Sequence, residues 1–227
     1  MIAALVPVKA LDQAKGRLAA LLSQEERRRL ALAMLEDVLR ALQAVPRVDQ
    51  VAVVSPDADV LARAEELRAE PLSEPPLCRG VNQALAHASA ALAGRGADAL
   101  LVVAADIPTA SPTDIEALLD ALPERGIAIA PTHDRGTGAI ALRPPDAIPF
   151  RFGRRSSVAH KREAVARGLP ACVLHLASLS RDVDEPDDLA DLLARPAETA
   201  THRFLAGLRI AERLGHAYRQ AGAGRPT

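Results

Sequence analysis

Residues 99–108 read ALLVVAADIP, and this stretch decides the class of fold. The run from Ala99 to Ala105 is entirely apolar, without the alternation of a strand that has one face in water. A strand of this kind is buried on both faces, as in the middle of a mostly parallel sheet covered by helices. Asp106 follows directly, at the edge where open α/β sheets bind their ligands. The stretch therefore predicts a central strand with a candidate ligand-binding carboxylate at its end.

Short apolar runs and amphipathic stretches alternate on both sides of this strand, which is the pattern of an α/β protein. The capping box SQEE (residues 23–26) begins a long helix. Further strands are predicted at 2–8, 50–55, 127–131, 139–143 and 171–177, and further helices at 57–69, 81–92, 111–122 and 157–167. Residues 9–22 and the proline-containing stretch 70–80 are predicted as loops. We expect one domain over residues 1–196 with a mixed, mostly parallel central sheet, and then a helical extension over 197–227 with a frayed end.

Composition excludes several classes of protein. Lys and Arg (28) nearly balance Asp and Glu (29) among the 227 residues, so the surplus of positive charge that nucleic acid or an anionic membrane requires is missing. Aromatic residues make up 2% of the chain and Trp is absent, which disfavours base-stacking surfaces. Cys78 and Cys172 match no metal-ligand spacing, and the sequence shows no signal peptide or membrane-spanning run. We expect a cytoplasmic protein with reduced cysteines that binds neither nucleic acid nor membranes.

Several familiar catalytic motifs are missing from the sequence. It has no Walker A sequence, no G-x-G-x-x-G after the first strand, no G-x-S-x-G and no H-E-x-x-H. These absences exclude P-loop NTPases, typical Rossmann dehydrogenases, α/β-hydrolases and zincins. The histidines are scattered, and each by itself is expected to be a surface or hydrogen-bonded core residue.

A basic loop follows the first predicted strand and contains Lys9, Lys15 and Arg17. Cations this close together repel one another unless they share an anion. A triphosphate is a suitable partner, because Lys acts as a point charge and Arg binds phosphate in a bidentate manner. A solvated basic loop is the ordinary alternative, and these residues alone leave it open.

Acidic residues later in the chain complement Asp106. Asp182 and Asp184 are separated by one residue, so in extended backbone their carboxylates point to the same side. With Asp106 they are expected to bind Mg²⁺, as two ions across a phosphoryl centre. Two glycine loops, RGTG (135–138) and GRRS (153–156), offer backbone amides and hydroxyls to an anion. Surface acids and plain turns are the ordinary alternatives.

Taken together, these clusters resemble a known family. The stretch VPVKALDQAKGRL (residues 6–18) is similar to the opening of the 2-phospho-L-lactate guanylyltransferases (CofC/FbiD). The similarity continues at LALAMLEDV (30–38), GVNQAL (80–85), ADIP (105–108), GTG (136–138), FRFG (150–153) with Ser156 and His160, and DVDEPDDL (182–189). It covers roughly residues 1–195, and the opening and FRFG are its most specific parts.

The resemblance implies a single-domain, Rossmann-like nucleotidyltransferase fold of the GT-A-like kind. It implies an enzyme that condenses GTP with 2-phospholactate, phosphoenolpyruvate or 3-phosphoglycerate and releases pyrophosphate, in the biosynthesis of the deazaflavin coenzyme F-420. A downstream transferase that accepts the labile product is an implied partner. The implied site residues are Lys9, Lys15 and Arg17 for catalysis and the GTP phosphates, Asn82 near the nucleotide, Thr137, Gly153 and Ser156 for the acceptor, and Asp106, Asp182 and Asp184 for Mg²⁺.

The first glycine loop departs from the family pattern. The family commonly has GTGTN where this chain reads GTGAI (136–140), so a hydroxyl and an amide expected to grip the acceptor are missing. This departure leaves the identity of the acceptor open. Two alternatives remain: a molybdenum-cofactor nucleotidyltransferase, which opens with a glycine-rich loop where this chain has PVKA (7–10), and a non-catalytic nucleotide-binding regulatory module.

Overall fold

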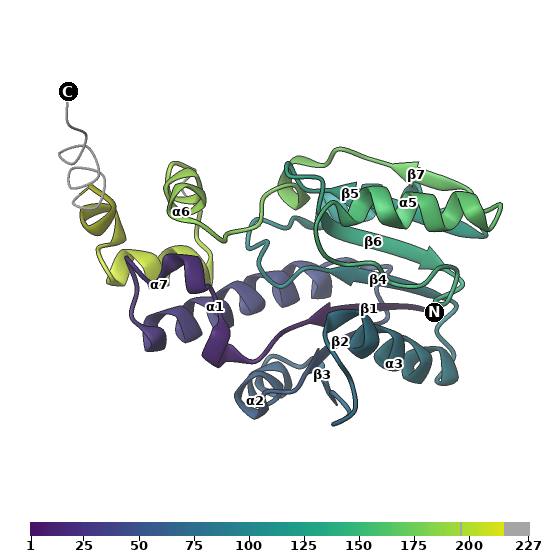
Figure 1. Cartoon of the computed structure of the whole chain (residues 1–227), viewed down its shortest axis with the longest axis horizontal. Helices are drawn as coiled ribbons and strands as arrows, with labels where there is room; N and C mark the ends of the chain where they lie inside the picture. The colour runs from purple at the N-terminus through teal and green to yellow at the C-terminus, as the bar shows by residue number, and fades with distance from the viewer. Residues whose placement is uncertain (196, 216–227) are drawn as a thin grey trace.

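The computed structural model describes residues 1–195 and 197–215, which form one sheet of seven strands covered by helices (Figure 1). The order across the sheet is β3-β2-β1-β4-β6-β5-β7. The strands are β1 (Ile2–Pro7), β2 (Gln50–Ser55), β3 (Glu70–Ser73), β4 (Ala99–Val103), β5 (Gly126–Pro131), β6 (Thr137–Arg143) and β7 (Ala171–Val173). Among these strands β6 runs antiparallel to its neighbours β4 and β5, and the other pairs are parallel. The predicted mixed, mostly parallel α/β sheet is confirmed.

Strand β4 occupies the middle of the sheet, as its apolar sequence predicted. It pairs with β1 on one side and with β6 on the other, and all of its residues are buried. Leu101 and Val103 pack into the core on one face of the sheet, and Leu100 and Val102 into the core on the other. Because both faces are covered, the strand has no polar alternation.

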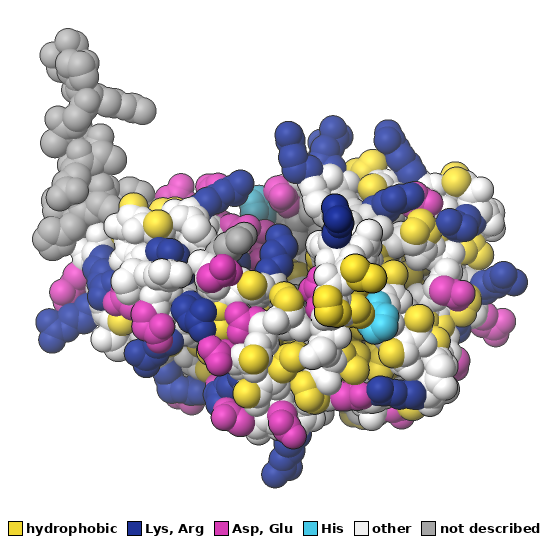
Figure 2. Space-filling view, turned by 60° about the horizontal axis from the view of Figure 1, so that its bottom comes forward, with side chains coloured by type: hydrophobic (Ala, Val, Ile, Leu, Met, Phe, Trp, Pro, Cys, Tyr) yellow, Lys and Arg dark blue, Asp and Glu magenta, His cyan; other side chains and the backbone are white. Residues whose placement is uncertain are grey.

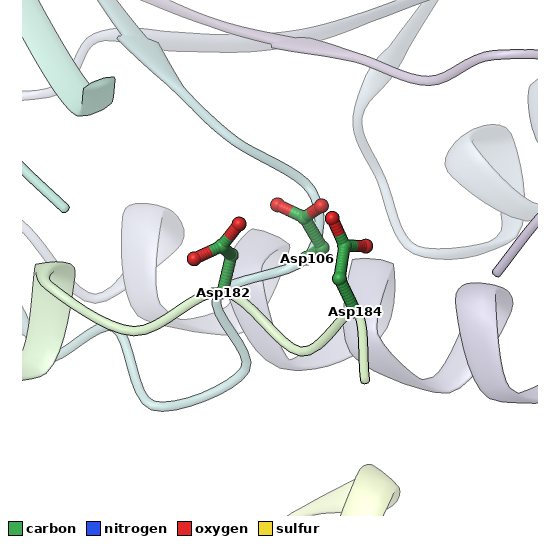
Figure 3. A group of neighbouring side chains, drawn as sticks. All are labelled: Asp106, Asp182 and Asp184. Carbon is green, nitrogen blue, oxygen red and sulfur yellow. The ribbon is translucent and has the colours of Figure 1, made fainter. Parts of the chain in front are cut away.

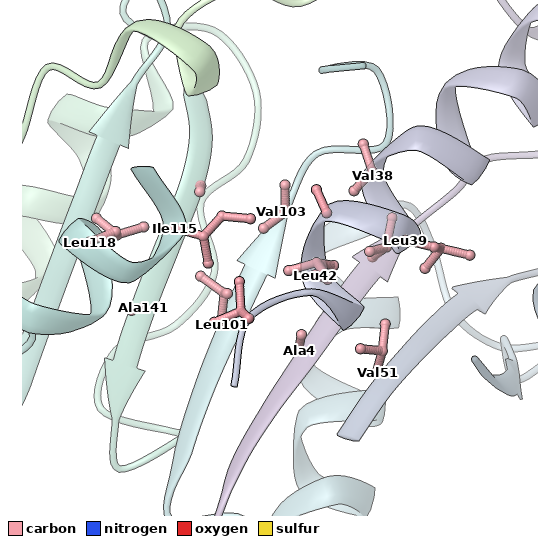
Figure 4. Packing of buried hydrophobic residues seen from close by; sticks show 14 of the residues in the cluster. Ala4, Val38, Leu39, Leu42, Val51, Leu101, Val103, Ile115, Leu118 and Ala141 are labelled. Atoms are coloured by element: carbon pink, nitrogen blue, oxygen red, sulfur yellow. The ribbon is translucent and has the colours of Figure 1, made fainter. Parts of the chain in front are cut away.

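Helices cover both faces of the sheet. One layer consists of α1 (Gln24–Gln43), α2 (Ala58–Glu66) and α4 (Pro112–Asp120), and the opposite layer of α3 (Val81–Gly94) and α5 (Ser156–Ala166). Figure 4 shows the first core, where Val38 and Leu39 of α1 and Leu118 of α4 pack over the strands. The Ser23 hydroxyl accepts from the Glu26 amide, and the Glu26 carboxylate accepts from the Ser23 amide, so the predicted capping box begins α1.

A third apolar cluster joins the C-terminal helices to the first half of α1. Helices α6 (Pro186–Leu193) and α7 (Ala200–Gly207) lie at one end of the molecule, with α7 beside α1 (Figure 1). Leu30 and Met34 of α1 pack there with Leu189 of α6 and Leu205 of α7. The domain boundary at residue 196 stays a prediction, and this cluster draws residues from both sides of it. The expected frayed end at 221–227 lies outside the described residues.

Three segments differ from their predictions. The stretch 70–80 was predicted to be a loop, but Glu70–Ser73 forms β3 against β2 at the edge of the sheet. Pro71 is tolerated there because an edge strand has one side on which no donor is needed. The last strand ends at Val173 instead of residue 177, and the loop after β1 contains two short 3-10 helices, Leu11–Gln13 and Gly16–Leu18.

The surface mixes charges of both signs. On the face shown in Figure 2, Lys and Arg side chains are interspersed with Asp and Glu, and hydrophobic side chains gather near the middle. This face therefore has no continuous basic surface of the kind that nucleic-acid binding uses. Within the described residues, none of the helices has both the length and the apolarity needed to cross a bilayer.

Close backbone packing at Gly138 brings a late segment of the chain against β6. A Cβ atom at Gly138 would lie 1.9 Å from the Leu179 carbonyl oxygen and 2.8 Å from the side chain of Ile107, so no side chain fits there. The Gly138 carbonyl also accepts a hydrogen bond of 2.9 Å from the Ala104 amide. These contacts place the residues that follow Leu179 beside the end of β4, where Asp106 lies.

We expect Gly138→Ala to lower the free energy of unfolding by about 3 kcal/mol or more, because backbone atoms must move to admit the methyl group. Gly94→Ala is the matched control, since a Cβ atom at Gly94 meets nothing within 4 Å. Urea denaturation of both variants checks this expectation. Equal midpoints for the two variants would show that the packing at Gly138 is not tight.

Candidate active site

Three carboxylates meet at the carboxyl end of β4. Asp106 lies shortly after β4, and Asp182 and Asp184 project from the chain just before α6 (Figure 3). One ligand oxygen from each residue lies within 4.8 Å of the other two. The amide of Val183 donates to the Asp106 carbonyl at 3.0 Å, and this bond fixes the two segments side by side. The structure thus brings together the three acids that the sequence singled out, and we call them the acidic triad.

The Lys15 ammonium lies among these carboxylates. Its Nζ atom is 2.9 Å from Asp106 Oδ2 and 2.7 Å from Asp184 Oδ1, and the side chain is 9% exposed. Burial by itself would lower the pKa of Lys15, but attraction to the two carboxylates outweighs it and raises the pKa. Lys15 therefore stays charged and offsets one of the negative charges of the acidic triad.

The negative charge that Lys15 does not neutralise acts on the carboxyl group of Asp182. Burial, followed by the negative charges of Asp106 and Asp184, raises the pKa of Asp182 to about 6. When all groups are ionised, three carboxylates and one ammonium leave a formal charge of -2. Mg²⁺ prefers oxygen ligands and is commonly held by one or two carboxylates with substrate phosphates. In charge and in donor chemistry, the acidic triad fits a divalent cation.

The three cations that were expected to share an anion differ in their surroundings. Lys15 is buried within the acidic triad, whereas Arg17 is exposed and pairs with Glu185 at 2.9 Å. Lys9 is exposed on the loop that follows β1. Because Arg17 is exposed, its ion pair contributes little stability and can be exchanged for another anion.

A cavity of 420 Å³ lies beside Asp106, one residue of the acidic triad. Lys9, Lys15 and Asp106 line one side of it, and Phe152 and Gly153 line another. A second hollow of 330 Å³ adjoins the same loop, because both hollows are lined by residues 7–10. The site is therefore a cleft at the carboxyl ends of β1 and β4, where open α/β sheets bind ligands.

The wall that carries Phe152 is held in place by Asn82. The Asn82 Nδ2 atom donates to the Phe152 carbonyl at 3.1 Å, and the Phe152 amide donates to Asn82 Oδ1 at 2.7 Å. Asn82 was expected near the nucleotide, but both polar atoms of its side chain bind this backbone. At the neighbouring Gly153, φ is 140° and a Cβ atom would meet nothing within 4 Å, so the wall has an open face there.

Thr137 and Ser156, the expected acceptor residues, lie side by side. Their hydroxyl oxygens are 2.8 Å apart, and the two residues are 6% and 1% exposed. Thr137 Oγ1 also lies 3.1 Å from His160 Nδ1, and His160 Nε2 accepts from the Arg151 amide at 2.9 Å. Burial lowers the pKa of the fully buried His160 to about 4. The structure joins β6, α5 and the FRFG segment through this network.

Ala139 and Ile140, where the chain departs from the family pattern, are not among the residues that line the cleft. Ala139 and Ile140 are fully buried in β6 and pack into the cores on opposite faces of the sheet. In this chain neither side chain is exposed to a ligand, and the role of these two positions in gripping the acceptor stays a prediction. The Gly136 amide, which was expected to face an anion, donates instead to Asp134 Oδ1 at 2.9 Å.

Sequence reasoning missed two features of the site. It assigned Lys15 to phosphates and did not foresee its pairing with the acidic triad, since those partners lie 91 and 169 residues away. It also gave His160 no role, although His160 and Ser156 were both among the residues that match the family. The spacing of four residues between them places both on one face of α5, and this helical spacing was the available signal.

Lys15→Met removes the ammonium and keeps an apolar stem of similar length. We expect Mn²⁺ to bind this variant at least about tenfold more tightly than wild type, because the ion no longer competes with Lys15 for two carboxylates. Isothermal titration calorimetry without nucleotide checks this, with Arg17→Met as the matched control that leaves the affinity unchanged. Equal affinities in all three proteins would exclude competition between Lys15 and the metal.

Because the pKa of His160 is lowered from 6.5 to about 4, folding keeps the ring neutral where the unfolded chain binds a proton. The free energy of unfolding of wild type relative to His160→Asn should therefore fall by up to about 3 kcal/mol as the pH drops from 6.5 to about 4, and then level off. Urea denaturation across this range measures the difference. A difference that does not vary with pH would mean that the ring titrates normally.

Comparison with known proteins identifies the family. Residues 2–221 match the family model described as "Guanylyl transferase CofC like". A phosphoenolpyruvate guanylyltransferase of Sphaerobacter thermophilus is 48% identical over 190 residues, which cover 83% of this chain and 91% of that protein. A 2-phospho-L-lactate guanylyltransferase of Methanothermobacter thermautotrophicus is 37% identical over 207 residues, covering 91% of each chain.

Solved structures agree with the fold. A nucleotidyl transferase from Methanothermobacter thermautotrophicus superimposes with a TM-score of 0.64 at 16% identity, covering 91% of this chain and 99% of that one. The relatives are named as enzymes, which decides against a non-catalytic module, and the family match decides against the molybdenum-cofactor alternative. The chain belongs to the CofC-like guanylyltransferases and is an enzyme with the nucleotidyltransferase fold.

Proposed function

We propose that this enzyme joins GTP to a small phosphorylated carboxylic acid and releases pyrophosphate. Among 2-phospholactate, phosphoenolpyruvate and 3-phosphoglycerate, phosphoenolpyruvate is the acceptor best supported, since it is named for the relative at 48% identity. The observation that carries the proposal is the cleft itself, whose lining includes Lys15 and Asp106 of the charged cluster together with Phe152 and Gly153. The charged side chains suit a triphosphate, and the open backbone at Gly153 suits a small acid.

The acidic triad is proposed to hold Mg²⁺, as two ions when the nucleotide is bound. The fit rests on its three oxygen donors and on the negative charge that Lys15 leaves uncompensated. When bound, the ions supply the positive charge that draws the triphosphate in and stabilises the departing pyrophosphate. Asp106, Asp182 and Asp184 are the residues that would hold them.

The remaining positive charge comes from the basic loop. Lys9 lines the cleft from its exposed rim, and Lys15 lies at its base. Arg17 lies on the same loop and pairs with an exposed carboxylate, that of Glu185. We propose that these three side chains hold the GTP phosphates, and that Lys15 moves from the carboxylates to the phosphates when metal enters. Their role is positional and electrostatic.

The reaction needs no nucleophile from the protein. An oxygen of the acceptor phosphate attacks the α-phosphorus of GTP, and the bond from this phosphorus to the bridging oxygen of the leaving pyrophosphate breaks. The acceptor phosphate is already ionised near pH 7, so no side chain must remove a proton from it. Thr137, Gly153 and Ser156 are proposed to orient the acceptor, with Asn82 holding the wall on which Gly153 lies.

The product of this reaction is a phosphoric anhydride, a reactive species that a following enzyme consumes. We propose that the protein acts in cytoplasmic biosynthesis of the deazaflavin coenzyme F-420, and that a downstream transferase accepts the product. The support for this placement is the membership of the guanylyltransferase family.

We expect pyrophosphate release from GTP and Mg²⁺ with phosphoenolpyruvate, and weaker or no release when 2-phospholactate or 3-phosphoglycerate replaces it. Mass spectrometry of the adduct identifies the product. Removing the metal with EDTA should abolish release, and added Mg²⁺ should restore it. Absence of release with all three acids, in folded protein, would overturn the proposed reaction.

Asp106→Asn and Asp184→Asn are each expected to lower kcat by about 100-fold or more, because each removes a charge from the proposed metal site. Asp191→Asn is the matched control: its carboxylate pairs with Arg181 on the exposed side of α6. Steady-state rates, with thermal unfolding to confirm the fold, measure the effect. Wild-type rates in either triad variant would remove that carboxylate from the metal site.

A further inference from the structure

Thr137 and Ser156 have two hydroxyl protons between them. How many of these protons are used within the pair and its bond to His160 depends on which ring nitrogen of His160 carries a proton. The atoms His160 Nδ1, Thr137 Oγ1 and Ser156 Oγ are joined in series at 3.1 and 2.8 Å. If Nδ1 were an acceptor, Ser156 would donate to Thr137 and Thr137 to the ring, and both hydroxyl protons would be used. If Nδ1 carries a proton, the ring donates to Thr137 and one hydroxyl proton of the pair is left over.

The backbone decides which of these two cases holds. The Arg151 amide lies 2.9 Å from His160 Nε2, and an N–H group can only donate, so Nε2 must be the acceptor nitrogen. A neutral ring with an unprotonated Nε2 carries its proton on Nδ1. The ring is neutral near pH 7, because burial lowers the pKa of His160 to about 4. His160 therefore donates to Thr137.

The left-over proton needs an acceptor oxygen. No further partner of the Thr137 and Ser156 hydroxyls is found among the described residues. Ser156 begins α5 and Thr137 begins β6. Ser156 follows closely after Gly153, which lines the cleft and whose Cβ position faces open space. An anionic oxygen reaching this place would receive a charge-assisted hydrogen bond.

We propose that His160 is a positioning residue, which orients the Thr137–Ser156 pair so that one hydroxyl proton is presented to an anionic oxygen of the acceptor. This inference rests on the proposed function, because the ligand that receives the proton is the phosphorylated acid. Thr137 and Ser156 touch the acid; His160 acts through them and sets the direction of their hydrogen bonds.

Two substitutions of His160 distinguish a role in orienting the Thr137 and Ser156 hydroxyls from a purely structural role in supporting the Arg151 backbone. The amide of Asn lies where the ring carries Nδ1, so His160→Asn keeps a donor toward Thr137 and loses the acceptor for the Arg151 amide. The amide of Gln lies where the ring carries Nε2, so His160→Gln keeps the acceptor for Arg151 and loses the donor toward Thr137. The two variants therefore differ in which hydrogen bond survives, and each loses one.

The experiment measures KM for phosphoenolpyruvate, KM for GTP, kcat and the thermal midpoint in wild type and both variants. We expect His160→Gln to raise KM for the acid about tenfold or more, with KM for GTP unchanged, and His160→Asn to keep KM for the acid within about threefold of wild type. In a Thr137→Val background, exchanging His160 for Gln should have no further effect on this KM.

Three outcomes would overturn the inference: equal effects of Asn and Gln on KM for the acid, parallel rises in both KM values that follow the loss of thermal stability, or a full effect of Gln in the Thr137→Val background. The last result also decides the matter if the Asn variant fails to fold. Failure of the proposed function is distinguishable, since wild type would then release no pyrophosphate with any acid.

Discussion

Three carboxylates held within 4.8 Å of one another impose the main electrostatic constraint on this molecule. Like charges this close together favour protonation of one group or the approach of a cation. Burial, together with the charges of Asp106 and Asp184, raises the pKa of Asp182 to about 6, and Lys15 is buried against Asp106 and Asp184. Lys15 therefore links the loop after β1 to the end of β4 and to the approach to α6, and a divalent ion would take over the role that Lys15 partly fills.

Backbone contacts keep this charged cluster together despite the repulsion within it. The closest approach is at Gly138, where the absence of a side chain lets the Leu179 carbonyl pack against β6. Beyond it, the Ser180 carbonyl accepts from the His133 amide at 3.0 Å, and the Val183 amide donates to the Asp106 carbonyl at 3.0 Å. These contacts carry no charge, so they act at any state of protonation or metal binding.

The opposite wall of the cleft is organised by hydrogen bonds in place of ion pairs. Asn82 binds the Phe152 backbone from α3, and His160 binds the Arg151 backbone from α5, so neighbouring peptide groups of one loop are fixed from two helices. The rings of Phe152 and His160 also meet edge to face, with centroids 5.0 Å apart. A wall whose polar atoms are fixed in this way is preorganised, whereas in the proposed function the ion pairs of Lys15 would have to rearrange to admit metal and phosphates.

The sequence by itself determined the architecture, because the burial of a strand or helix is visible in the local order of its apolar and polar residues. The apolar run of β4, the capping box at Ser23 and the alternation of strands and helices all translate into the observed sheet, and β3 was missed because Pro71 at an edge strand imitates a loop. Local spacing also indicated that Asp182 and Asp184 share a side. Only the tertiary structure decided the partners: that Lys15 neutralises part of the acidic triad, that Asn82 holds a wall, and that His160 carries its proton on Nδ1. Each of these depends on atoms far apart in the chain, whose distances are set by packing and leave no periodicity in the sequence.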